Sequence, residues 1–71
     1  MISRKLLPLA AMEKLLKAAG AERVSEKAKA ALRAVVEEMA DEMAVSAVKF
    51  AWHAGRKTVK AGDIKLAARG L

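Results

Sequence analysis

The sequence predicts an all-α domain made of a short helix, a long helix and a second short helix, which assembles with a second copy of itself. Apolar residues recur at helical spacing in three segments that are separated by two glycine-containing turns. The central segment runs for nearly 30 residues without Gly or Pro. A chain of 71 residues is too short to cover so long a helix on its own.

The first helix is expected over residues 8–19, after a short basic arm of residues 1–7. Pro8 suits the first turn of a helix, because its missing N–H has no helical partner there. Gly20 supplies the stop. The apolar positions between them recur at helical spacing, and they are Leu9, Met12, Leu15, Leu16 and Ala19.

The second helix is expected over residues 26–54, with Ser25 as its N-cap and an acid, Glu26, in its first turn. One continuous apolar stripe runs along this helix, and it comprises Ala28, Leu32, Val35, Val36, Met39, Met43, Ser46, Ala47, Phe50 and Ala54. A second stripe, Val45, Val48 and Trp52, lies roughly opposite the first. This helix therefore requires apolar partners on two sides. Its acids are expected on a solvated outer face rather than in a cation site, and they are Glu37, Glu38, Asp41 and Glu42.

The third helix is expected over residues 60–69. A helix of nearly 30 residues is about 40 Å long, whereas a compact globule of this size has a radius of gyration of only about 11 Å. Two helices of some ten residues each cannot cover both sides of the long one. An intertwined homodimer with crossing long helices is the simplest solution, and its stability would then depend on association.

The charge distribution indicates a polyanionic partner. The net charge is +6, from 14 Lys and Arg against 8 Asp and Glu. Residues 1–25 carry a net +3, residues 26–54 a net −1 and residues 55–71 a net +4. Positive charge therefore gathers in the ends and turns, where a surface for nucleic acid would need it. A membrane-surface peptide would instead place its cations along one helix face.

Several functional classes lack the residues that they need. The chain has no Cys and one His, so disulfides, zinc sites and general-base catalysis are not expected, and neither are an enzymatic activity, a cofactor or a small-molecule substrate. No apolar run approaches a membrane span. Charged residues interrupt the apolar start of the chain at amphipathic-helix spacing, which argues against a signal peptide. We expect a cytoplasmic protein associated with the chromosome or nucleoid.

Three stretches resemble the archaeal histone family. "AAGAERVS" (18–25) and "HAGRKTVKAGDIKLA" (53–67) are similar to the two loop regions of that family, and "EEMADEMAVSAVKFA" (37–51) is similar to its central helix. The resemblance runs from Pro8 to Arg69. It implies a histone fold, which is a homodimer of crossed long helices with loop 1 of one chain beside loop 2 of the other. The dimer core that it implies comprises Leu32, Val35, Val36, Met39, Met43 and Ala47.

The resemblance also implies double-stranded DNA as the partner. Arg23 matches the loop-1 arginine that enters the minor groove, and Thr58 matches the loop-2 threonine beside it. A guanidinium suits that narrow, negative groove. The full set expected to bind DNA is Arg4, Lys5, Lys14, Lys17, Arg23, Ser25, Lys57, Thr58 and Lys60. Arg56 matches an arginine that pairs with the aspartate seven residues on, here Asp63, and so fixes loop 2.

Members of this family join dimers through a four-helix bundle, and Phe50, His53, Asp63 and Leu66 match that contact. Gly20 matches a small residue where stacked DNA turns bring dimers close. Trp52 departs from the family, which usually has a polar or charged residue there. It can cap the core, lie in a dimer–dimer contact or be exposed.

The implied function is a chromatin protein that dimerises, wraps and compacts duplex DNA with little sequence preference, and forms higher oligomers on it. Paralogous histones are further candidate partners. The alternative is a histone-fold subunit that pairs with another protein in transcription regulation. Self-pairing is favoured because both loops keep their DNA residues in one chain.

Overall fold

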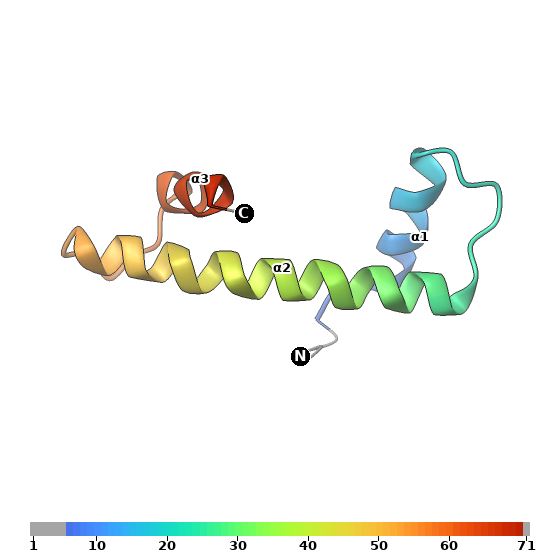
Figure 1. Ribbon diagram of the computed structural model, residues 1–71, viewed down its shortest axis with the longest axis horizontal. Coiled ribbons are helices and arrows are strands. Elements are labelled where there is room, and N and C mark those ends of the chain that lie inside the picture. Colours follow the sequence, from blue (N-terminus) through green and yellow to red (C-terminus); the bar gives the residue numbers. More distant parts are fainter. Residues whose placement is uncertain (1–5, 71) are drawn as a thin grey trace. The chain divides into compact units, whose positions relative to one another are not determined.

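The computed structural model describes residues 6–70, which form three helices, α1 (Leu9–Ala18), α2 (Glu26–His53) and α3 (Ala61–Arg69) (Figure 1). No strand occurs within that range. Each helix end lies within one residue of the range indicated by the sequence. Pro8 was expected inside the first turn, but it occupies the extended N-cap position just before it, with φ −75° and ψ 137°. The arrangement is the short–long–short helix order of a histone fold.

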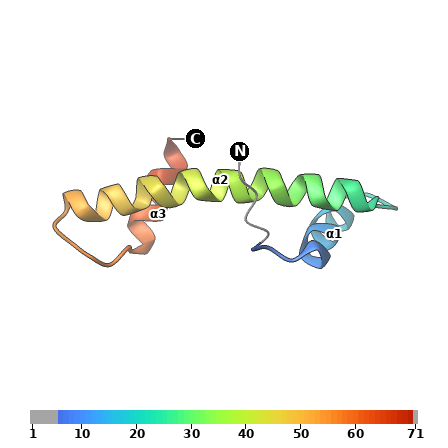
Figure 2. The same cartoon turned by 90° about the horizontal axis from the view of Figure 1, so that it is seen from below.

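The chain forms two compact units, Met1–Glu38 and Met39–Leu71, and the boundary between them falls within α2. In the first unit, α1 lies beside the N-terminal half of α2. In the second unit, α3 lies beside the C-terminal half of α2, as both views show (Figure 1, Figure 2). Each unit is therefore a short helix joined by a loop to one half of α2.

Gly20 ends α1, because the turn at this point needs a positive φ. Gly20 has φ 119°, a backbone conformation that side chains rarely adopt. Its N–H donates to the carbonyl of Lys17 at 3.0 Å, and the N–H of Ala21 donates to the carbonyl of Leu16 at 3.0 Å. These two bonds form a Schellman motif, which satisfies the last carbonyls of the helix and turns the chain into loop 1, residues 19–25.

The long helix ends in the same way. Gly55 has φ 72°, and its N–H donates to the carbonyl of Trp52 at 2.9 Å. The N–H of Arg56 donates to the carbonyl of Ala51 at 2.9 Å, which completes a second Schellman motif. Arg56 is thereby fixed as the first residue after the turn. Loop 2, residues 54–60, therefore leaves α2 in a defined direction.

Side-chain hydrogen bonds cap the N-terminal ends of α2 and α3. The Ser25 hydroxyl oxygen accepts the N–H of Ala28 at 3.0 Å, so Ser25 is the N-cap of α2, as its position in the sequence indicates. At α3 the backbone N–H of Lys60 donates to Asp63 Oδ2 at 2.8 Å, which is the carboxylate half of a capping box. Loop 1 and loop 2 are thus each held between a Schellman motif and a capped helix start.

The single chain buries few large apolar side chains. Within residues 6–70 the buried apolar residues are Met12, Ala47, Ala51 and Ala67. Large apolar side chains stay exposed on α2, including Val35 at 53% and Met39 at 48%. Both belong to the stripe expected to face a second copy. Exposed apolar side chains along one face of a helix mark a surface for contact with another protein surface.

The expectation of a solvated acidic face on α2 is wrong for Glu37. This residue is only 5% exposed, and its Oε2 accepts the backbone N–H of Leu7 at 2.8 Å. The N–H of Leu7 lies just before α1 and has no helical partner, so it needs an acceptor from elsewhere in the fold. Glu37 supplies that acceptor and ties the start of α1 to α2.

Trp52 is exposed, with 68% of its surface accessible. Val45, one of the same stripe, is 57% exposed. Within its own chain Trp52 does not cap the core, and this end of α2 carries a large apolar side chain on its surface.

Candidate nucleic-acid interface

Loop 1 presents an arginine and a hydroxyl outward. Arg23 and Ser25 are both exposed. Ser25 uses its oxygen to cap α2, which leaves its O–H free to donate. Both side chains border an open hollow of about 550 Å³. Its lining residues are Leu16, Ala21, Arg23, Val24, Ser25 and Ala28. Among the described residues none bonds to the Arg23 guanidinium, so it is available to an external anion.

Loop 2 divides its cations into one inner and two outer groups. Arg56 is half-buried, whereas Lys57, Thr58 and Lys60 are exposed. The carbonyl of Thr58 accepts Arg56 Nη1 at 2.9 Å, so the inner arginine also holds the loop backbone. The Thr58 hydroxyl and the two ammonium groups are left on the surface.

Arg56 and Asp63 form a bidentate ion pair. Arg56 Nη1 donates to Asp63 Oδ2 at 3.0 Å, and Nη2 donates to Oδ1 at 2.9 Å. Asp63 is only 3% exposed. The planar guanidinium matches both carboxylate oxygens at once, which lysine could not do. This is the pair that the resemblance to archaeal histones implied, and it links loop 2 to the first turn of α3.

The ion pair lowers the pKa of Asp63 to about 2, chiefly through the hydrogen bonds from Arg56 and then through the backbone N–H of Lys60. The same contact raises the pKa of Arg56. Asp63 is therefore a carboxylate at any pH at which DNA is bound. It neutralises Arg56 inside the fold, so the outward charge of loop 2 comes from Lys57 and Lys60.

The lysines of α1 differ in their surroundings. Lys14 and Lys17 are both exposed, as a contact with DNA requires. The Lys17 Nζ, however, lies 3.2 Å from Glu13 Oε2. Glu13 also binds Lys29 of α2 at 3.2 Å. The four-residue spacing of Glu13 and Lys17 could have indicated the first contact, but the second depends on how α1 packs against α2. Arg4 and Lys5 lie outside the described residues.

The residues expected in a dimer–dimer contact are accessible with one exception. Phe50 is 38% and Leu66 48% exposed, and His53 is exposed. Asp63 is the exception, because it faces Arg56 within its own chain. Its Oδ1 accepts Arg56 Nη2 with one lone pair, and a carboxylate oxygen has a second lone pair for a further donor.

Other chemistries find little support in residues 6–70. No group of three or more His, Asp or Glu side chains lies close enough to hold a metal ion. No helix in that range is both long and apolar enough to cross a bilayer. The exposed cations of loops 1 and 2 and of α1 are among the groups that could bind a large anion.

Comparisons with known proteins agree with the fold. The sequence profile of the family described as "Histone-like transcription factor (CBF/NF-Y) and archaeal histone" matches residues 5–68. The chain is 54% identical over 63 residues to one of the subunits of the archaeal histone HAN1 of Thermococcus zilligii, and the match covers 89% of this chain and 94% of that protein. It is 50% identical over 64 residues to "Probable archaeal histone 3" of Methanocaldococcus jannaschii, and the match covers 90% of this chain and 96% of that protein.

The chain belongs to the family of histone-like transcription factors and archaeal histones. Its fold and its relatives make it a DNA-binding chromatin protein, of a structural family whose members associate through histone–histone contacts. The exposed cations of both loops are consistent with that role.

The Asp63 ion pair makes the free energy of unfolding depend on pH in the acid range. The folded-state pKa of about 2 lies below the ordinary value of 3.8. The contribution of Asp63 is therefore fully present above that ordinary value and is lost as the pH falls toward about 2. We expect the unfolding midpoint to fall over that interval in the parent protein, and much less in Asp63→Asn, which should already be less stable at neutral pH.

Thermal unfolding followed by circular dichroism from acid to neutral pH measures this effect. Glu42→Gln is the control, because Glu42 is exposed and its replacement removes one carboxylate elsewhere. This variant should keep the acid transition of the parent. If Asp63→Asn loses stability in acid as steeply as the parent, the ion pair is not the source of the transition.

Proposed function

We propose that this chain forms an intertwined homodimer that wraps and compacts duplex DNA with little sequence preference. The observation that carries the proposal is the outward position of the cations and hydroxyls on both loops. Arg23, Lys57 and Lys60 are exposed, and no carboxylate of the described residues forms an ion pair with them. Such groups bind the phosphate backbone, which offers the same contacts at every sequence.

Each proposed contact has a separate physical role. The Arg23 guanidinium enters a narrow minor groove, where the negative potential is strongest. Thr58 of the partner chain lies beside it and positions it or donates to a phosphate. Lys57 and Lys60 bind phosphate, as do Lys14 and Lys17 on α1. The Ser25 hydroxyl adds a donor at the start of α2, and Arg4 and Lys5 extend the cationic surface from the arm.

The dimer is supported by the apolar surface that one chain leaves uncovered. Val35 and Met39 are about half exposed, and Leu32, Val36 and Met43 are only partly buried. These residues follow one stripe of α2, together with the buried Ala47. A second α2 laid across this stripe would remove it from water, and each chain would do the same for the other.

Dimers are proposed to assemble further on DNA through Phe50, His53, Asp63 and Leu66, paired across a four-helix bundle. The exposure of the two apolar residues supports this arrangement. His53 of one dimer would donate to the remaining lone pair of Asp63 of another. Gly20, which has no side chain, would allow neighbouring DNA turns and their dimers to approach closely.

A second candidate is a histone-fold subunit that pairs with a different chain in transcription regulation. Two names support it. The matching family includes transcription factors, and the Thermococcus zilligii relative is named as one of several subunits. The apolar stripe of α2 would serve such a partner equally well. The oligomeric state of the protein alone in solution therefore discriminates between the two candidate functions.

DNA binding should be strongly dependent on salt and nearly independent of sequence. Each lost phosphate contact reduces the slope of log K against log salt by about 0.9. We expect Arg23→Ala to weaken binding and to reduce any preference for easily bent DNA, and Thr58→Val to weaken it less. Fluorescence anisotropy with several duplexes over a range of salt measures both effects.

The control for that experiment is Lys49→Ala. Lys49 is exposed on α2 and belongs to no proposed contact, so it tests the loss of one charge alone. Strong selection of one short sequence at physiological salt would contradict binding through the backbone.

Unfolding should depend on protein concentration if the chain is an obligate homodimer. We expect the midpoint to rise with concentration, because association stabilises only the folded chains. Met39→Lys should destabilise the protein by at least about 2 kcal/mol, since it places a charge in the proposed core. Ala44→Lys is the control, because Ala44 is exposed on the same helix and belongs to neither apolar stripe. A monomer in native mass spectrometry, with a midpoint that ignores concentration, would rule out self-pairing.

Assembly beyond the dimer should require His53. We expect His53→Ala to leave the dimer folded and able to bind DNA, because no proposed DNA residue is changed. The larger complexes should be lost, so that nuclease digestion leaves shorter protected fragments. Glu42→Ala, an exposed change elsewhere on α2, should protect the same lengths as the parent. Unchanged fragments from His53→Ala would remove His53 from the contact.

A further inference from the structure

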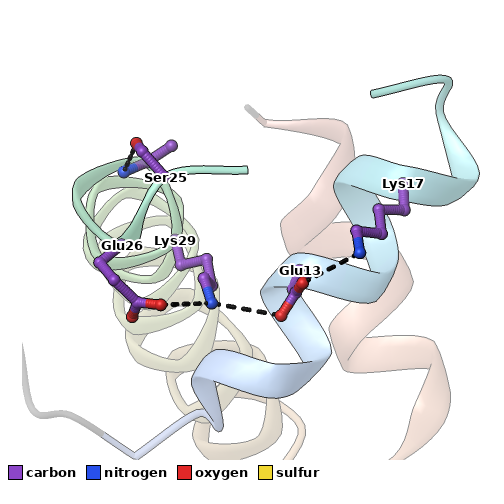
Figure 3. A network of polar contacts seen from close by, with 6 residues as sticks. Glu13, Lys17, Ser25, Glu26 and Lys29 are labelled. Atoms are coloured by element: carbon purple, nitrogen blue, oxygen red, sulfur yellow. Dashed lines mark hydrogen bonds and ion pairs between the residues drawn. The ribbon is translucent and has the colours of Figure 1, made fainter. Parts of the chain in front are cut away.

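A network of alternating charges joins α1 to the start of α2 (Figure 3). Glu13 is its centre, with Oε2 at 3.2 Å from Lys17 Nζ and Oε1 at 3.2 Å from Lys29 Nζ. Lys29 in turn binds Glu26 at 2.8 Å. Two carboxylates and two ammonium groups therefore sum to zero charge at a place where the fold carries candidate DNA contacts.

The members of this network differ in their access to solvent. The Lys17 side chain is 51% exposed, whereas that of Lys29 is 12% exposed and lies between two carboxylates. Glu13 is intermediate, at 34%. Lys29 is thus the anchored cation, and Lys17 is the one that an external phosphate could reach.

We propose that Glu13 is an intramolecular competitor of DNA phosphate for Lys17, so that α1 contributes less to DNA affinity than its lysines would otherwise allow. The inference rests on the proposed function, because it requires α1 to approach DNA. Glu13 acts through Lys17 rather than by touching DNA, and it is therefore a positioning residue. Lys14, the residue that follows Glu13 on α1, forms no ion pair within the described part of the chain and so binds phosphate without this competition.

The competition follows from the chemistry of the three groups. An ammonium can donate to a carboxylate oxygen or to a phosphate oxygen. When phosphate approaches Lys17, Glu13 does not leave the surface, because Lys29 still holds its other oxygen. Its negative charge then remains close to the incoming phosphate and opposes it. The pKa of Glu13 is lowered, first by Lys17 and then by Lys29, so this carboxylate is charged wherever the protein binds DNA.

The pair is exposed, so the competition is reversible. An ion pair of this kind is weak and is screened by salt. Glu13 therefore reduces the contact of Lys17 without abolishing it. The effect should be largest at low ionic strength, where attraction to phosphate and repulsion by the carboxylate are both strongest.

A double-mutant cycle tests the proposal. DNA affinity is measured over a range of salt for the parent, Glu13→Gln, Lys17→Ala and the double variant. Glu13→Gln should tighten binding several-fold and steepen the slope of log K against log salt by about 0.9 for each phosphate newly bound. Lys17→Ala should weaken binding by a smaller factor in the parent than in the Glu13→Gln background, where Lys17 is free to bind phosphate.

Two controls separate competition from net charge. Lys14→Ala should weaken binding by the same factor in both backgrounds, since Lys14 has no carboxylate partner among the described residues. Glu42→Gln makes the same charge change as Glu13→Gln on another surface, and it should leave the salt slope unchanged. If Lys17→Ala has equal effects with and without Glu13, the proposal is overturned. If the parent itself does not bind DNA, the proposed function fails instead.

Glu13→Gln also weakens the contact with Lys29, so its unfolding midpoint is measured beside the cycle. A second measurement needs no variant. Carbon-13 NMR of the Glu13 carboxyl group gives its pKa in the parent protein, free and bound to DNA. The pKa should rise on binding, as Lys17 turns to phosphate. An unchanged pKa in the bound protein would also overturn the competition.

Discussion

The need to cover the apolar surface of α2 is the constraint on which the rest of this structure depends. A helix of 28 residues is accompanied by helices of ten and nine residues, and these bury little more than alanines along it. Small side chains allow close packing, but they remove little apolar area from water. Val35 and Met39 remain about half exposed as a result. In the proposed homodimer a second chain covers this surface, and folding and association are then coupled.

Loop 2 shows how one buried carboxylate can organise a surface. Asp63 accepts hydrogen bonds from both terminal nitrogens of the Arg56 guanidinium and from the backbone N–H of Lys60 at the start of α3. Arg56 also holds the carbonyl of Thr58. The loop backbone and the helix start are thus fixed by one pair of opposite charges, which cancel one another. The remaining cations, Lys57 and Lys60, are left pointing to solvent on a backbone that is already ordered, so that binding an anion there costs little further ordering.

Charge in this protein is therefore divided between holding the fold and reaching outward. Arg56 and Lys29 are paired within the chain, whereas Arg23 and Lys14 form no ion pair with the described residues. Net charge alone does not distinguish these groups. Lys17 stands between the two classes, because it is exposed and also paired. The number of cations that the surface offers to DNA is accordingly smaller than the 14 Lys and Arg residues of the sequence.

The sequence by itself determined the helices and their ends, because caps are local. Ser25, Gly20 and Gly55 act on backbone groups within a few residues. The Arg56–Asp63 pair lies within one short segment as well, and it was implied by the resemblance to archaeal histones. Only the tertiary structure decided where distant groups meet. Glu37 accepts a backbone N–H 30 residues away, and Glu13 finds Lys29 across two helices, so neither contact has a local pattern. Trp52 fits an apolar stripe by spacing, yet it is exposed, because no neighbouring helix of its unit covers that side. Local rules fix conformation, whereas burial and pairing depend on which surfaces packing brings together.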